Sequence, residues 1–386
     1  MRTTKRFGAL ALTASMFLVV ACGSDDNTTT TEAPSSEAPS SEAPSTDAPS
    51  TDAPSTDAPS TDAPSTDVAV TGDVPADAAS VGLLFDVTGK GDKSFNDAAA
   101  AGLAQAVTEF GVKPTESTPT GDGDRAERMN LVIDDGNGLV IGVGFLWGDA
   151  LTAGAAENPD TSFAIIDSVI DAPNVASLVF AENEGSFLVG VAAGLKTTSN
   201  KVGFIGGVEN DLIKNFQVGF EAGVAAANPD AEVLVQYISQ PPDFTGFNDP
   251  TKGKEIAAAM YADGADIVYS AAGGSGLGAF EAAAEAGAPG DVWAIGVDSD
   301  QYNLVSAELQ PYILTSMLKK VDVAVYETIK AFNEGSFAAG VQVFNLASDG
   351  VGYSKSGGFV DDIADQIDGY ADQIISGDIK VPSASS

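Results

Sequence analysis

The chain has 386 residues, 44% of them hydrophobic, and its 55 acidic and 18 basic residues give a formal net charge of −37. A negative field of this size opposes binding to nucleic acid and to anionic membrane surfaces. The sequence contains no histidine and one cysteine, which excludes His-dependent catalytic triads, an intrachain disulfide and most transition-metal sites, and we expect no cofactor.

Residues 1–21 are typical of a secretory signal peptide. Basic residues open the segment, and the apolar run over 7–20 is too short to span a bilayer as a mature helix. Cys22 lies just after this run and resembles the cysteine of a bacterial lipobox, which is acylated and becomes the mature N-terminus. We expect a lipid anchor there, including palmitate, on the extracytoplasmic face of the cell membrane. The alternative is a plain secretory signal that happens to contain a cysteine.

Residues 32–66 repeat a five-residue unit seven times, first as Glu-Ala-Pro-Ser-Ser and later as Asp-Ala-Pro-Ser-Thr. Each unit has one proline, one acid and no large apolar side chain, so the segment cannot build a core. A semi-extended chain of this length reaches on the order of 100 Å at the ~3.1 Å per residue of polyproline II. We expect residues 22–78 to be a stalk between the anchor and a folded body.

The body alternates apolar strands with amphipathic helices. Strands are expected at 81–85, 139–144, 162–166, 176–180, 201–205, 232–237, 267–270, 292–297 and 312–316. Helices are expected at 97–110, 185–195, 215–226, 251–262, 277–286 and 321–333. Continuous Val-, Ile- and Ala-rich strands between helices are typical of parallel sheets buried on both faces. The pattern occurs before residue 195 and again after residue 201, which indicates two similar doubly wound α/β lobes.

The turn after the first strand carries the most informative side chains of the body. Asp92, Phe95 and Asn96 place a carboxylate, an aromatic ring and an amide where α/β folds bind ligands, outside the carboxyl ends of the strands. A ring beside hydrogen-bonding groups suits a flat, polar, uncharged ligand such as a nucleobase. The alternative is an ordinary turn in which Asn96 or Asp97 caps the helix and Phe95 packs into the core.

A glycine-rich run over 273–278 follows a strand and opens a helix. It lacks the Walker lysine and the spacing of a dinucleotide fingerprint, so a phosphate site is not predicted. Backbone N–H groups at such a helix start can instead bind ligand hydroxyls. The run can equally serve only close packing.

Several segments together resemble the basic membrane protein (Bmp) family of lipoproteins, whose best-understood members are purine nucleoside receptors of ABC transporters. The segments are Asp86 with 92–96, 141–145, 163–167, Asp249 with 252–255, 264–268, 271–276, and 314–319 with 321–322. The similarity covers residues 81–382 and follows one order. The chain departs from the family in its acidic charge and its repeat stalk.

The resemblance implies a type I periplasmic-binding-protein fold, in which two Rossmann-like lobes joined by a hinge close on a ligand. Lobe I is expected to comprise 79–182 and about 299–340. Lobe II is expected to comprise 183–298 and about 341–386.

The resemblance also implies a ligand site formed by nine residues. They are Asp86, Phe95, Asn96, Asp167, Phe216, Phe247, Gly273, Asp298 and Lys319. In the family, the matched groups of Phe95 and Asn96 hold the purine, and the carboxylates matched by Asp86 and Asp167 meet its polar edge. A second aromatic comes from the other lobe, with Phe216 and Phe247 both open as candidates.

The groups matched by Gly273, Asp298 and Lys319 hold the ribose hydroxyls in the family. A carboxylate at the end of a strand can accept two hydroxyls, and a lysine can balance its charge. The alternatives are that Asp298 caps a turn and that Lys319 is a surface charge.

The resemblance therefore implies a non-enzymatic solute-binding lipoprotein that captures a purine nucleoside (adenosine, guanosine or inosine) for ABC permease and ATPase subunits. A sugar or autoinducer receptor of the same fold is the alternative, and a nucleoside-hydrolysing enzyme is a weaker one. A wall-displayed adhesin has only the stalk in its support.

Overall fold

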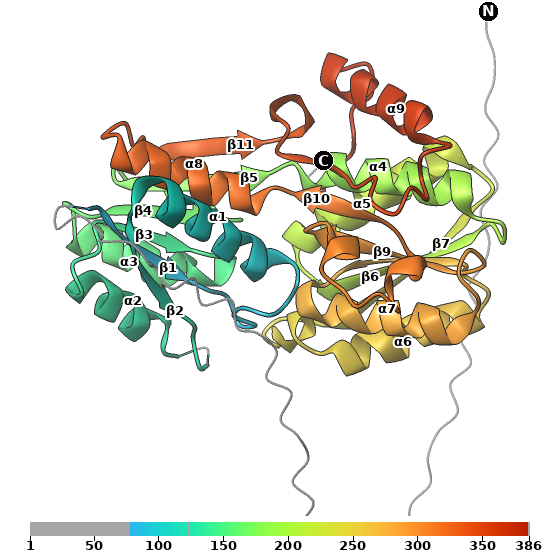
Figure 1. The fold of residues 1–386 in the computed structure, drawn as a ribbon, viewed down its shortest axis with the longest axis horizontal. Coiled ribbons are helices and arrows are strands. Elements are labelled where there is room, and N and C mark those ends of the chain that lie inside the picture. Colours follow the sequence, from blue (N-terminus) through green and yellow to red (C-terminus); the bar gives the residue numbers. More distant parts are fainter. Residues whose placement is uncertain (1–77, 122, 385–386) are drawn as a thin grey trace, which may run out of the picture. The chain divides into compact units, whose positions relative to one another are not determined.

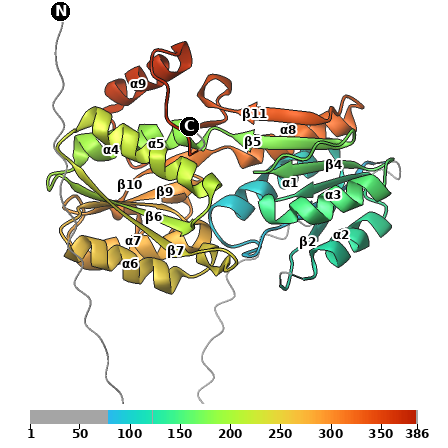
Figure 2. The same cartoon turned by 180° about the vertical axis from the view of Figure 1, so that it is seen from behind.

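The computed structural model describes residues 78–121 and 123–384, which belong to one compact unit. The unit contains two six-stranded sheets, each with helices on both faces (Figures 1 and 2). Both sheets are parallel except for one short edge strand. This architecture confirms the predicted fold class of two doubly wound α/β lobes.

The first sheet has the strand order β11-β5-β4-β3-β1-β2, and all of its pairs are parallel. Its strands are β1 Ser80–Leu84, β2 Lys113–Ser117, β3 Leu139–Gly142, β4 Ser162–Ile166, β5 Val175–Phe180 and β11 Gly340–Phe344. One face packs on α1 Phe95–Phe110 and α8 Val321–Asn333, and the other on α2 Arg125–Asp134 and α3 Gly148–Glu157. Figure 1 shows these helices on opposite sides of the sheet.

The second sheet has the order β12-β10-β9-β8-β6-β7, in which only β12 is antiparallel to its neighbour. Its strands are β6 Lys201–Val208, β7 Glu232–Ser239, β8 Ile267–Ala271, β9 Trp293–Asp298, β10 Ile313–Lys319 and β12 Val351–Tyr353. Its helices are α4 Glu182–Lys196 and α5 Asp211–Ala227 on one face, and α6 Pro250–Ala262 and α7 Gly276–Ala286 on the other. Helix α9 Ala364–Ser376 packs on α4 through a ring contact between Tyr370 and Phe187.

The nine strands and six helices expected from the sequence are all present. Their central strands are buried along their whole length, as in β3 and β8, which is why their apolar runs are continuous. The elements that the sequence analysis did not predict are β2, β11, β12, α2, α3 and α9. Strand β2 lies at a sheet edge and alternates between half-buried and exposed residues, and its sequence contains no large apolar side chain.

The predicted lobe boundaries are wrong for two strands. Lobe I is expected to include about 299–340, but β10, which lies within that range, pairs with β9 in the second sheet. Residues from 341 were assigned to lobe II, but β11 pairs with β5 in the first sheet. A fully buried parallel strand has the same residue pattern in either sheet, so sequence periodicity does not reveal which sheet it joins. The chain passes between the lobes after β5, after β10 and after β11.

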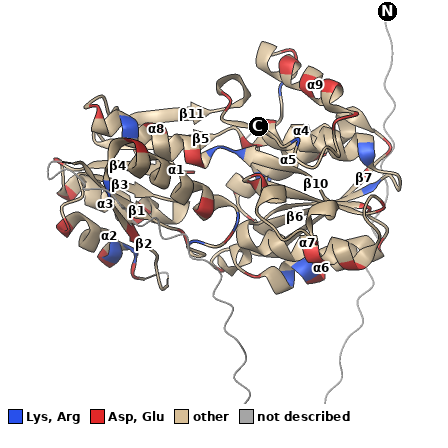
Figure 3. Ribbon diagram, in the orientation of Figure 1, with Lys and Arg blue, Asp and Glu red and all other residues tan. Residues whose placement is uncertain are grey.

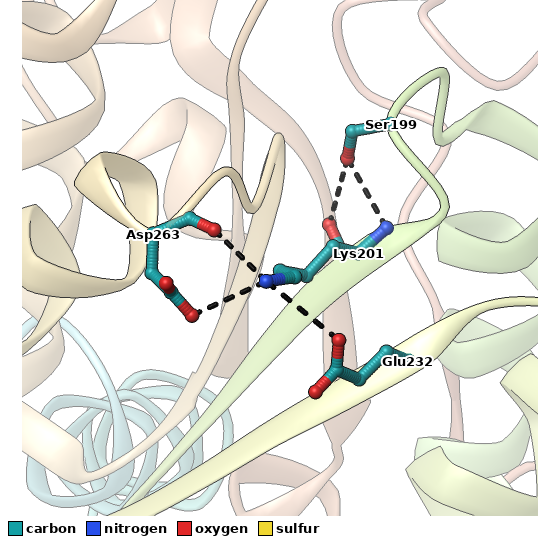
Figure 4. Close-up of polar contacts among 4 residues, drawn as sticks. All are labelled: Ser199, Lys201, Glu232 and Asp263. Carbon is teal, nitrogen blue, oxygen red and sulfur yellow. Dashed lines mark hydrogen bonds and ion pairs between the residues drawn. The ribbon is translucent and has the colours of Figure 1, made fainter.

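The amino-terminal end of β6 is held by an exposed charge cluster (Figure 4). The Lys201 ammonium lies 3.2 Å from the Asp263 carboxylate and 3.6 Å from that of Glu232, and it donates to the Asp263 carbonyl at 2.9 Å. Exposed pairs of this kind contribute little to stability. Because the cluster lies at the start of a strand, it is remote from the carboxyl ends where ligands bind in such sheets.

Helices α4 and α5 approach each other so closely that their backbones touch through glycines. A methyl group on Gly223 would overlap the Phe187 carbonyl oxygen, and one on Gly190 would overlap that of Phe220. Gly369, in the middle of α9, has no neighbour within 4 Å of the position a methyl group would take. The first two glycines are therefore required by packing and the third is not.

We predict that Gly223→Ala destabilises the protein by about 1–3 kcal/mol, because the added methyl forces the two helices apart. Gly369→Ala should be neutral or stabilising by up to about 1 kcal/mol, since alanine has the higher helix propensity. Urea denaturation of both variants measures the difference. Equal stability of the two variants would contradict the close packing of α4 on α5.

Candidate functional site

A pocket lies between the carboxyl ends of the two sheets and contains about 550 Å³ of empty space, including the part that is open to solvent. All nine residues expected to form a ligand site line it. The other lining residues are Thr88, Asp92, Gly144, Phe145, Leu212, Ile213, Ala271 and Val297. Both lobes contribute, as the carboxyl edges of two doubly wound sheets facing each other allow.

The turn before α1 is organised by Asp92. Its carboxylate accepts backbone hydrogen bonds from Ser94, Asn96 and Asp97 at 2.9–3.1 Å and so satisfies the free N–H groups of the helix start. The helix begins at Phe95, two residues before the predicted start, and neither Asn96 nor Asp97 takes the capping position.

Asn96 is held at both ends of its amide. Its nitrogen donates to Asp92 at 2.9 Å, and its oxygen accepts from the Asp86 backbone N–H at 2.8 Å. The side chain is 1% exposed. Asn96 thus fixes the position of Asp86 relative to the start of α1, and its oxygen is already bonded within the protein.

Four phenylalanines line the pocket, and three of them are among the predicted site residues. Phe95 comes from α1, and Phe216 and Phe247 come from the second lobe. Phe95 is half-buried: it packs against the hydrophobic core, as the alternative interpretation of this turn has it, and it also lines the pocket. Both candidates for the second aromatic line the pocket, and the side chain of Phe216 is the more deeply buried.

Lys319, the last residue of β10, is the buried cation of the site. Its ammonium donates to Asp167 at 2.6 Å and lies 3.3 Å from a Glu182 oxygen, while its side chain is 2% exposed. The ammonium also lies 5.1 Å from the ring centres of Phe95 and Phe180. Burial lowers the pKa of Lys319, but the surrounding carboxylates outweigh it and hold the pKa above its usual value. Lys319 is therefore not a surface charge.

Asp167 and Asp298 occupy equivalent places in the two lobes. Asp167 follows β4 and Asp298 ends β9, and each of these strands is third in the order of its sheet. Both residues have a left-handed backbone, with φ of 65° for Asp167 and 63° for Asp298. Aspartate tolerates this conformation better than most residues. One Asp167 oxygen bonds Lys319, and the other has no hydrogen-bond partner although it is buried. An unpaired buried carboxylate oxygen beside a pocket is available to a ligand donor.

Asp298 bonds across the lobes. Its carboxylate accepts from the Ser94 hydroxyl, and Ser299 donates to the Ser94 carbonyl at 3.0 Å. Gln301 donates to the Lys93 carbonyl at 2.9 Å. Burial raises the pKa of Asp298 to about 6, against the opposing effect of Lys319. The turn before α1 is thus tied to the carboxyl end of β9.

Asp86 is the third strand-end acid of the pocket. It accepts from the Val87 N–H at 2.8 Å and lies 3.8 Å from the guanidinium of Arg125. Burial raises its pKa to about 6, and the Val87 bond and Arg125 act in the opposite direction. Arg125 itself lies over the Trp147 ring, 5.8 Å from its centre.

The acids around the pocket outnumber the cations. Carboxylates come from Asp86, Asp92, Asp167, Glu182 and Asp298, whereas the buried cations described here are Lys319 and Arg125. Such a site favours ligands that donate hydrogen bonds and opposes anions. Figure 3 shows acidic residues on the helices of both lobes as well. Within the described residues, no acid cluster is arranged to hold a metal ion.

Glu182, Arg125 and Ser94 were missed by the sequence analysis. An acid in the first turn of a helix is usually a solvated partner of the helix dipole, so nothing in the sequence marks Glu182 as buried. Arg125 follows a polar loop and begins a helix that was not predicted. Ser94 lies inside the recognised segment 92–96. Its hydroxyl group could have marked it as a hydrogen-bonding residue of the site.

The comparisons with known proteins agree with the fold. The family described as "ABC transporter substrate-binding protein PnrA-like" (Bmp) matches residues 79–385. The CD4+ T-cell-stimulating antigen of Listeria monocytogenes is 36% identical over 324 residues, which cover 78% of this chain and 88% of the relative. The ABC transporter nucleoside-binding protein BmpA of Lactococcus lactis is 36% identical over 328 residues, covering 81% and 91%.

A solved ABC transporter solute-binding protein from Aeropyrum pernix K1 superposes with a TM-score of 0.70 at 31% identity, covering 79% of this chain and 94% of that one. The family match over residues 79–385 includes every strand of both sheets. The chain belongs to the Bmp family and is the substrate-binding component of an ABC transporter.

Proposed function

We propose that this protein captures purine nucleosides in the pocket between its lobes and delivers them to an ABC importer. The observation that carries the proposal is that phenylalanine side chains and strand-end carboxylates line the same pocket. Aromatic faces stack on bases, and carboxylates accept from ring N–H, amine and hydroxyl groups. The nucleoside-binding protein named among the relatives supports the same ligand class.

The base is proposed to lie against Phe95, with Phe216 or Phe247 on its other face. Asp86 then meets the polar edge of the purine, together with the free oxygen of Asp167. Phe95 and Asp86 come from neighbouring parts of one turn, which Asn96 holds together through its bond to the Asp86 backbone. Stacking on an aromatic ring contributes roughly 1–3 kcal/mol and tolerates different bases.

The ribose is proposed to lie toward Asp298, Lys319 and Gly273. Gly273 has φ of 54° and begins the short helix before α7, so its backbone closely borders the pocket. Asp298 already accepts from Ser94, which leaves its remaining lone pairs for ligand hydroxyls. Lys319 keeps the local charge of these acids compensated.

The proposed partners are the permease and ATPase subunits of the importer, and the proposed location is the extracytoplasmic face of the cell membrane, held by a lipid on Cys22. Cys22, the signal peptide and the stalk lie outside the described residues. No helix in residues 78–121 and 123–384 is long and apolar enough to cross a membrane.

Calorimetry of the protein against adenosine, guanosine and inosine should give micromolar or tighter binding, and AMP should bind at least tenfold more weakly than adenosine. The buried acids and the charge of −37 both oppose a phosphate. Phe95→Ala should weaken the binding of every nucleoside by roughly 1–3 kcal/mol, with little change in selectivity among them. Tighter binding of AMP than of adenosine would contradict a nucleoside site, and binding of free ribose or another sugar alone would favour the sugar-receptor alternative.

Cys22→Ala should abolish membrane anchoring or leave the signal peptide uncleaved, because the acylated thiol is the proposed membrane attachment. Fractionation of cells that produce the wild-type and variant proteins measures this directly. A fully processed Cys22→Ala protein that stays with the membrane would show that Cys22 is not the anchor.

A further inference from the structure

Two polar side chains of the second lobe donate hydrogen bonds to backbone carbonyls of the first lobe. The Ser299 hydroxyl donates to the Ser94 carbonyl at 3.0 Å, and the Gln301 amide donates to the Lys93 carbonyl at 2.9 Å. None of these four residues is among those that line the pocket. The two contacts therefore join the lobes beside the pocket, outside the space that a ligand would fill.

The loop before α1 presents carbonyl groups to the second lobe because its N–H groups are bonded within the first. The N–H groups of Gly91 and Lys93 donate to the Asp97 carboxylate at 2.7 and 2.9 Å, and that of Ser94 donates to Asp92 at 3.0 Å. Lys93 has a left-handed backbone with φ of 53°. The loop thus has a fixed shape that leaves the Lys93 carbonyl for a donor from the other lobe.

Gln301 is equally fixed within the second lobe. Its amide oxygen accepts from the Val297 N–H at 2.9 Å, and its backbone N–H donates to the Ser316 hydroxyl at 3.2 Å. Gln301 is 1% exposed, and Gly296 provides the space for it, since a methyl group on Gly296 would overlap the Gln301 amide oxygen. Because that oxygen is already bonded, the amide nitrogen is the group that remains for Lys93. Donor and acceptor are both held in place, so little side-chain freedom is lost when they meet.

These contacts also join two walls of the pocket. Ser94 directly precedes Phe95, and Ser299 directly follows Asp298. The Ser94 hydroxyl donates to the Asp298 carboxylate as well. A movement that parts the lobes here breaks the contacts of Ser299 and Gln301 and draws Phe95 away from Asp298.

We propose that Ser299 and Gln301, through their bonds to the loop 93–94, form a latch that holds the lobes closed and slows the release of a bound nucleoside. This inference rests on the proposed nucleoside function. Contacts made only in the closed arrangement shift the equilibrium between open and closed forms by their own free energy. A ligand leaves through the open form, so the latch lowers the dissociation rate and leaves the association rate nearly unchanged. The latch consists of protein atoms alone, so it also forms in a fraction of the ligand-free protein.

Rapid-filtration measurements on the full-length protein with radiolabelled inosine give both rates. Ser299→Ala removes one bond across the lobes and leaves the Ser94 carbonyl bonded to the Ala98 N–H at 3.0 Å. Its dissociation rate should be about fivefold higher than that of the wild type, the effect of one neutral hydrogen bond, with an association rate within about twofold. Ser299→Thr keeps the hydroxyl and should restore the wild-type dissociation rate.

Gln301→Glu tests the other half of the latch. It keeps an oxygen to accept from the Val297 N–H but replaces the donor to the Lys93 carbonyl by a carboxylate oxygen. The dissociation rate should rise by about tenfold, because a hydrogen bond is lost and two acceptors then face each other.

The matched control is Asn303→Ala, in the same short helix Gln301–Asn303. Asn303 is exposed and bonds Asp300 at 2.8 Å and Ser356 at 3.2 Å, both in its own lobe. It should keep the wild-type rates. A wild-type dissociation rate in Ser299→Ala or in Gln301→Glu, or a raised rate in Asn303→Ala, would overturn the latch.

A second measurement needs no ligand. Hydrogen exchange of residues 91–97 in the ligand-free, full-length protein should be faster in the double variant Ser299→Ala/Gln301→Glu than in the wild type, because the loop loses its hold on the second lobe. The substitutions lie in one lobe and the exchanging segment in the other, and exchange in β3 of the first lobe should be unchanged. Equal exchange of residues 91–97 would overturn the latch. If the wild type binds no inosine, the proposed function fails, and the exchange comparison still decides on the latch.

Discussion

The ammonium group of Lys319 is the interaction on which the site depends. A buried cation costs several kcal/mol unless partners compensate it, and here the partners come from both lobes and from the hinge. Asp167 approaches it from the first sheet and Glu182 from the start of α4, and the charge of Asp298 at the end of β9 adds a longer-range attraction. This arrangement requires the carboxyl ends of the two sheets to face each other closely, which is also what encloses the pocket.

The two lobes contribute to the site in matching ways. Each sheet ends a corresponding strand on a left-handed aspartate, Asp167 in one and Asp298 in the other. The segments around them are also alike, Phe-Ala-Ile-Ile-Asp and Ala-Ile-Gly-Val-Asp. The loop before α1 breaks this symmetry by reaching across to Asp298 through Ser94, and it brings Phe95 to the pocket. The ligand site is therefore built from a repeated framework with one lobe-specific loop.

The sequence pattern predicted nine of the strands and the principal helices, and the nine residues that the family resemblance implied are among those that line the pocket. The strand-end acids Asp86 and Asp298 were named through the family resemblance, and their places at the ends of buried strands agree with it. The sequence could not show which lobe β10 and β11 belong to, since parallel strands have similar residue patterns in either sheet. The burial of Glu182 could not be predicted from the sequence either, because it depends on three segments that are distant in the chain and meet only in the folded protein. Likewise, the family resemblance indicated a ribose contact for Lys319 but not its ion pairs with Asp167 and Glu182.

The most direct measurement of this account is small-angle X-ray scattering of Lys319→Met with and without saturating inosine, beside the wild-type protein. Methionine retains much of the length of the lysine side chain but removes its charge, leaving the three acids uncompensated. The account predicts that the wild-type protein becomes more compact with inosine and that Lys319→Met stays expanded and does not bind. A Lys319→Met protein that binds inosine and compacts as the wild type does would contradict the claim that this ammonium holds the lobes and the site together.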